Sequence, residues 1–145
     1  MKAFPQNSTI VLVHGAWADG SCWSNVILPL QRHGLKVICA PIPLTSLTDD
    51  VAALSRALEL TNGPVALAGH AYAGAVIAAT PEKRVKSLVY VAALAPDEDE
   101  TVAKVFYRDE PHPEALSWLR IRMAFYGCPK TGFAERLPTR RQPTK

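Results

Sequence analysis

Short β-branched runs alternate with helical segments along the first two thirds of the chain. Strand-like runs lie at residues 9–13, 36–40, 65–68 and 87–92, and the stretches between them carry apolar residues at helical spacing. The runs are almost continuously apolar, as is typical of strands that are buried on both faces. Because such alternation implies right-handed crossovers, the sequence predicts an α/β fold, a parallel doubly wound sheet with helices on both faces.

The expected helices have recognisable ends. One begins near Ser24 and ends at Gly34, and the next is capped by Thr48 or Asp49 and ends at residues 62–64. A small-residue helix is expected from about residue 72 to residue 80. After residue 96 the pattern decays, and only residues 114–126 give a weak further helix.

Length and composition exclude several classes of protein. The 145 residues suffice for one domain with one core, and 48% hydrophobic with 20% charged residues excludes wholesale disorder. No apolar run reaches the roughly 18 to 20 residues of a membrane span, and the N-terminus lacks the apolar segment of a signal peptide. We therefore expect a cytoplasmic protein with no membrane partner. The three cysteines lack metal or redox spacing, so free thiols and no metal are expected; they are Cys22, Cys39 and Cys128.

The charge changes sign near the C-terminus. Residues 1–119 carry a net charge of −3 and residues 120–145 one of +6. Prolines interrupt the basic segment and no aromatic pattern accompanies it, so nucleic-acid binding is not expected. We divide the chain into a domain at residues 1–114 and a basic, proline-containing tail at residues 115–145. Two explanations of the tail stay open: translation out of frame, or poor order.

The third strand ends in an unusual turn. The sequence Gly69-His70-Ala71-Tyr72-Ala73-Gly74 places small residues on both sides of Ala71 at a strand-to-helix junction. This is the form of a nucleophile elbow, G-x-S-x-G, with alanine in place of serine. In open α/β sheets the working groups lie beyond the carboxyl ends of the strands, where this turn is expected.

Four motifs in order resemble the α/β-hydrolase superfamily, and specifically the bacterial relatives of the plant methylesterase and hydroxynitrile lyase branch. They are VLVHGAWADGSCW, LTSLTDDVAAL, GPVALAGHAYAGAVI and KSLVYVAALAPDE. The resemblance runs from about residue 9 to residue 113, the N-terminal part of such a domain. It implies hydrolysis of small carboxylic esters without a cofactor.

The resemblance also assigns roles to residues. The backbone N–H groups of Ala16 and Tyr72 would form the oxyanion hole, and Ala71 would occupy the nucleophile position without a hydroxyl. A structural or motif role falls to His14, Gly15, Gly69, His70 and Gly74. No position matches the family's catalytic acid or histidine, so a catalytically inactive pseudoenzyme is expected.

Two further readings stay open. The chain could be a binding protein that keeps the pocket for a small-molecule ester or carboxylate, or a lyase that works without a serine. If the sheet ends at the fourth strand, its uncovered edge predicts self-association.

Overall fold

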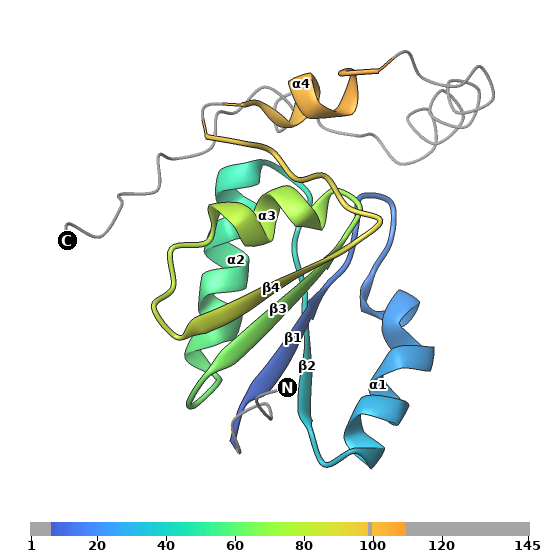
Figure 1. Ribbon diagram of the computed structural model, residues 1–145, viewed down its shortest axis with the longest axis vertical. Coiled ribbons are helices and arrows are strands. Elements are labelled where there is room, and N and C mark those ends of the chain that lie inside the picture. Colours follow the sequence, from blue (N-terminus) through green and yellow to red (C-terminus); the bar gives the residue numbers. More distant parts are fainter. Residues whose placement is uncertain (1–6, 99, 110–145) are drawn as a thin grey trace.

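Four parallel strands form the centre of the molecule. The computed structural model describes residues 7–98 and 100–109. The strands are β1 (Thr9–Val13), β2 (Lys36–Ala40), β3 (Val65–His70) and β4 (Val85–Val91), in the spatial order β2-β1-β3-β4. Every neighbouring pair is parallel, as Figure 1 shows. The predicted doubly wound parallel sheet is confirmed.

Helices cover both faces of this sheet. The helices α2 (Leu47–Glu59) and α3 (Ala73–Ala79) lie on one face, and η1 (Gly20–Trp23) with α1 (Ser24–Arg32) lies on the other (Figure 1). The larger core forms under α2 and α3, where Leu54, Leu58 and Val76 are fully buried beside Val11 and Leu67 of the sheet. The face under α1 holds a smaller cluster built on Leu12, Trp23 and Ala68.

The cap of α2 differs from the sequence prediction. Thr48 and Asp49 were the expected caps, but the helix begins at Leu47 and its N-cap is Ser46. The Ser46 hydroxyl accepts a hydrogen bond from the Asp49 backbone N–H at 3.0 Å, and it donates to the Asp49 carboxylate at 2.8 Å. Reciprocal bonding of this kind satisfies an otherwise orphaned N–H group of the first turn.

Other boundaries also shift. Strand β3 continues to His70 and β4 begins at Val85, because pairing with neighbouring strands extends both beyond their apolar runs. A short helix, α4 (Val102–Phe106), follows the fourth strand, where no helix was predicted. It is capped by Thr101 and buries Val102. The candidate helix at 114–126 and the tail at 115–145 lie outside the described residues.

Strand β4 is the edge of the described sheet. Val89, Tyr90 and Val91 are between 39% and 46% exposed, whereas β3 beside them is almost fully buried. An exposed apolar edge is the feature on which self-association was predicted, and that remains a prediction.

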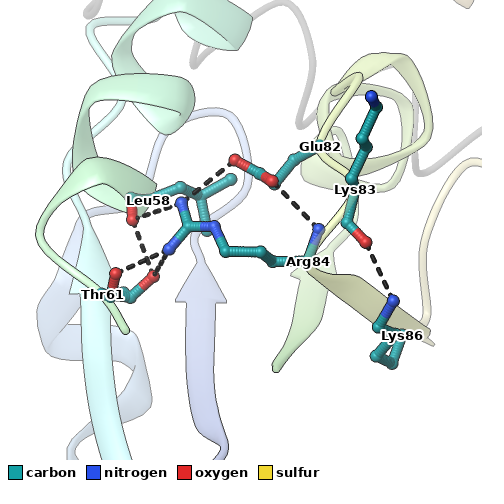
Figure 2. A network of polar contacts seen from close by, with 6 residues as sticks. All are labelled: Leu58, Thr61, Glu82, Lys83, Arg84 and Lys86. Atoms are coloured by element: carbon teal, nitrogen blue, oxygen red, sulfur yellow. Dashed lines mark hydrogen bonds and ion pairs between the residues drawn. The ribbon is translucent and has the colours of Figure 1, made fainter. Parts of the chain in front are cut away.

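Arg84 links the end of α2 to the start of β4 (Figure 2). Its guanidinium donates to the backbone carbonyl of Thr61 at 2.6 Å and to that of Leu58 at 2.9 Å. The same group pairs with Glu82 at 3.0 Å. Helix-terminal carbonyls have no partner within the helix and carry partial negative charge, so a cation is well suited to them.

A buried carboxylate links α2 to two segments at the carboxyl end of the sheet. Asp50 is fully buried; its Oδ1 accepts from the Leu44 backbone N–H at 2.7 Å and its Oδ2 from the Tyr72 hydroxyl at 2.8 Å. Burial raises the pKa of Asp50 above its ordinary value of 3.8, while the two hydrogen bonds act in the opposite direction. Loss of solvation outweighs the hydrogen bonds at this carboxyl group.

We expect Arg84→Met to lower the free energy of unfolding by about 2 kcal/mol, because the hydrogen bonds from its charged guanidinium to the Thr61 and Leu58 carbonyls are lost. Lys86→Met is the control, since among the described residues the exposed Lys86 ammonium bonds only to the Lys83 carbonyl, at 3.0 Å. Urea unfolding midpoints check the difference. Equal midpoints for the two variants would contradict this role of Arg84.

Asp50→Asn should become more stable relative to the unsubstituted chain as the pH rises from 4.5 to 7.5. Because the pKa of Asp50 is raised in the folded state, its contribution to the free energy of unfolding is fully present below pH 3.8. That contribution is lost as the pH rises through the folded-state pKa. Asparagine stays neutral and can still accept from Leu44. Urea unfolding of both chains at each pH measures the change, and a difference that does not vary with pH would refute it.

Candidate functional site

The turn after β3 holds Ala71 in a left-handed conformation. Its φ is +52°, a region that an alanine adopts at a cost of roughly 1 to 2 kcal/mol. The backbone around it is fixed from two directions: the Ala71 N–H donates to the Val91 carbonyl at 3.3 Å, and the Ala71 carbonyl accepts from Leu94 at 3.0 Å. Hydrogen bonds to the last residue of β4 and to the segment after it therefore hold the strained residue in place.

The two glycines of the turn are required by close backbone contacts. A Cβ on Gly69 would lie 2.7 Å from the Ala73 carbonyl oxygen, and one on Gly74 would overlap the Leu94 carbonyl oxygen. Backbone cannot move aside as a flexible side chain can, so only glycine fits at either position. The Gly69 contact is a close approach of β3 to α3, and the Gly74 contact is one of α3 to the segment after β4.

The loop after β1 packs directly against this turn. A Cβ on Gly15 would lie 3.0 Å from both the Ala71 Cβ and the His70 carbonyl oxygen. Gly15 therefore brings the chain after β1 into contact with Ala71, as two neighbouring strands of a parallel sheet allow.

His14 has structural partners on both ring nitrogens. The ring is buried, Nδ1 lies 3.0 Å from the Gly15 carbonyl oxygen, and Nε2 accepts from the Ile42 backbone N–H at 3.4 Å. This arrangement requires the proton on Nδ1. It ties the loop after β1 to the segment after β2.

His70 is half-buried, and its ring meets Trp23 edge to face with the ring centroids 6.4 Å apart. It precedes Ala71 directly, so it lies at the turn, but its observed ring contact is to the cluster under α1. The motif or structural roles expected for His14 and His70 stay predictions.

The two expected oxyanion donors each follow a residue of the contact between Gly15 and Ala71. Ala16 follows Gly15, and its backbone N–H donates to no group within residues 7–98 and 100–109. Tyr72 follows Ala71 and begins the turn into α3. Each of the two residues is therefore next in sequence to a residue of the Gly15–Ala71 contact.

Trp17 comes next to Ala16 and adopts a φ of +62°. Its indole Nε1 is buried, as is that of Trp23, and neither finds an acceptor among the described residues. A buried N–H without a partner costs about 1 to 3 kcal/mol, so each such donor calls for an explanation.

The side-chain pairing of Asp50 with Tyr72 was missed by the sequence analysis. A carboxylate in the first turn of a helix normally faces the helix's own N–H groups, so only the three-dimensional fold shows that Asp50 is buried against Tyr72. The signal available in the sequence was a second aspartate directly after Asp49, which itself bonds to the cap residue.

Cys22 does not provide an alternative nucleophile. Burial and the nearby Asp19 carboxylate raise the pKa of the Cys22 thiol above its usual value, so it is protonated at neutral pH. The pKa of the Cys39 thiol is likewise raised, chiefly by burial. Cys22 and Cys39 are free thiols, as the sequence predicts, and Cys128 lies outside the described residues.

Within the described ranges, no three His, Cys, Asp or Glu side chains gather in a way that could hold a metal ion. No helix in the same part of the chain is long and apolar enough to cross a membrane.

Comparison with known proteins places this geometry in a family. The carbendazim hydrolyzing esterase of Nocardioides sp. (strain SG-4G) is 29% identical, over an alignment that covers 66% of this chain and 46% of the esterase. The chain thus spans about half the length of this curated relative.

Solved structures share the fold. A pyrethroid hydrolase from Sphingobium faniae JZ-2 superimposes with a TM-score of 0.73 at 21% identity, covering 92% of this chain and 72% of that one. A monoacylglycerol lipase from Paleococcus ferrophilus gives 0.55 at 15% identity, covering 82% and 48%. The sequence model of the alpha/beta hydrolase family matches residues 10–144. The protein belongs to the alpha/beta hydrolase family.

Proposed function

We propose that this chain binds small carboxylic esters on an α/β-hydrolase scaffold without cleaving them through the elbow residue. The observation that carries the proposal is Ala71 itself. Its backbone has the left-handed shape of a nucleophile elbow, with glycines at the two positions where no Cβ fits, yet its side chain is a methyl group. A methyl group has no electron pair with which to attack a carbonyl, so no acyl-enzyme forms there.

Backbone groups supply the binding interaction. An oxyanion hole is built from main-chain N–H groups, which the loss of a side-chain hydroxyl leaves in place. The Ala16 N–H has no acceptor in the described structure, and Ala16 and Tyr72 follow the two residues, Gly15 and Ala71, that touch. An ester carbonyl oxygen between these two donors is the ligand that we propose.

The ligand class agrees with the named relatives, one of which is an esterase and another a pyrethroid hydrolase. The order of the motifs in the sequence further supports a place beside the methylesterase and hydroxynitrile lyase branch, which we keep as part of this proposal. The buried indole N–H of Trp17, next to Ala16, is a further donor that a bound acceptor could satisfy.

The purified chain should bind phenyl butyrate reversibly and release no p-nitrophenol from p-nitrophenyl butyrate above the rate in buffer. Calorimetry measures the binding, absorbance measures the release, and intact-protein mass spectrometry checks that no acyl adduct forms. The reason is that the carbonyl is held by backbone donors while position 71 offers no nucleophile.

The matched variant is Ala71→Ser, which returns a hydroxyl to the same turn. Both ring nitrogens of His14 are already bonded, and His70 contacts Trp23. Because a serine without a hydrogen-bonded base is a weak nucleophile, we expect this variant to stay within about tenfold of the background rate. Turnover by the unsubstituted chain, with a contaminating esterase excluded, or failure to bind phenyl butyrate, would contradict the proposal.

A further inference from the structure

Asp50 uses both of its carboxylate oxygens outside its own helix. The first-turn N–H of Asp49 is capped by Ser46, whereas the side chain of Asp50 accepts from Leu44 and from the Tyr72 hydroxyl. Its side chain is fully buried. A buried carboxylate is expensive to desolvate, so a position that needed only packing would be filled better by an apolar side chain.

The contacts of Asp50 connect to those of His14. Leu44, with a φ of +60°, lies two residues after Ile42, and Ile42 donates to the His14 ring. The segment after β2 is therefore held at two points, by His14 from β1 and by Asp50 from α2.

Together these contacts form a closed series, called the contact ring here, that runs through His14, Gly15, Ala71, Tyr72 and Asp50 and returns through the segment after β2. His14 bonds to the Gly15 carbonyl, and Gly15 packs against Ala71, which precedes Tyr72 in the chain. The Tyr72 hydroxyl then returns to Asp50 at 2.8 Å. Every segment that carries a proposed carbonyl donor is a member of this ring.

We propose that Asp50 is a positioning residue of the ester site: by holding the Tyr72 phenol and the Leu44 amide, it sets the Tyr72 backbone N–H relative to that of Ala16. The inference rests on the proposed function for the identity of the ligand. Asp50 touches no ligand and acts through Tyr72. Asp50 affects the direction of the Tyr72 backbone N–H, and a misaligned N–H forms a much weaker hydrogen bond.

Two ligands of almost the same shape isolate the carbonyl contact. Phenyl butyrate carries the carbonyl oxygen, and butyl phenyl ether lacks it. We expect the unsubstituted chain to bind the ester about tenfold more tightly than the ether, the ratio that corresponds to one net hydrogen bond. The ratio of the two dissociation constants, measured by calorimetry, is the readout.

Tyr72→Phe removes the hydroxyl that Asp50 holds and leaves the ring in place. We expect this variant to bind the ester less than about threefold more tightly than the ether, since a misaligned backbone N–H at position 72 no longer favours the carbonyl. Asp50→Asn is the conservative variant: its amide can accept from Leu44 and donate to the Tyr72 oxygen, so we expect it to keep the ratio of the unsubstituted chain.

Thr80→Val is the matched control. Thr80 is buried at the other end of α3, and its hydroxyl donates to the Val76 carbonyl at 2.8 Å. This variant loses a buried hydroxyl from the same helix region and should unfold at lower urea, yet it should keep the ratio. A role of Tyr72 in stability alone would make Tyr72→Phe and Thr80→Val behave alike.

A readout without ligand separates the two proposals. In ¹⁵N–¹H spectra, Tyr72→Phe should shift the backbone amide signals of Tyr72 and Ala16 well beyond their change in Thr80→Val. Equal ester and ether affinities in the unsubstituted chain, together with these shifts, would refute the proposed function and retain the positioning role. An unchanged ratio in Tyr72→Phe, or amide signals that do not move, would overturn the inference.

Discussion

The crossing of backbone at Ala71 is the constraint on which the rest of the site depends. Strand β3 ends, the chain turns through a left-handed residue, and α3 begins two residues later, all within contact of Leu94 and Gly15. Backbone passes so close to backbone that Gly69 and Gly74 have no room for a Cβ. An alanine is kept in an unfavourable conformation because hydrogen bonds on both sides of it would otherwise be broken.

A second constraint is the buried polar chain that runs from His14 to Asp50. A buried polar group is stabilised by pairing, and here His14 and Asp50 both accept from backbone N–H groups of the segment after β2. Such pairing fixes loops that hydrophobic contact alone would leave free to shift, since the hydrophobic effect has no direction. The carboxyl edge of the sheet therefore owes its shape to polar contacts, while the core under α2 and α3 owes its stability to apolar burial.

The proposed site combines the backbone turn of a nucleophile elbow with an alanine side chain. Turn shape, glycine positions and the adjacent loop all belong to the backbone, and backbone geometry tolerates the exchange of a hydroxyl for a hydrogen at Ala71. In the proposed function no cleavage occurs through residue 71, because a methyl group has no oxygen with which to attack a carbonyl. Binding and cleavage can for this reason separate in such a scaffold, because the donors for a carbonyl are main-chain groups and the nucleophile is a side chain.

The sequence by itself determined the strand runs, their parallel arrangement and the elbow. Apolar periodicity and the spacing of Gly69, Ala71 and Gly74 are local properties, so β1 and β2 were predicted with their observed bounds. Local pattern was less reliable at the cap of α2, where Ser46 and not Thr48 or Asp49 proved to hold the first turn, and it missed α4. Only the tertiary structure decided that Asp50 meets Tyr72 and that Gly15 touches Ala71. These pairs lie 22 and 56 positions apart in the sequence, and no periodicity reports which distant groups a fold will bury together.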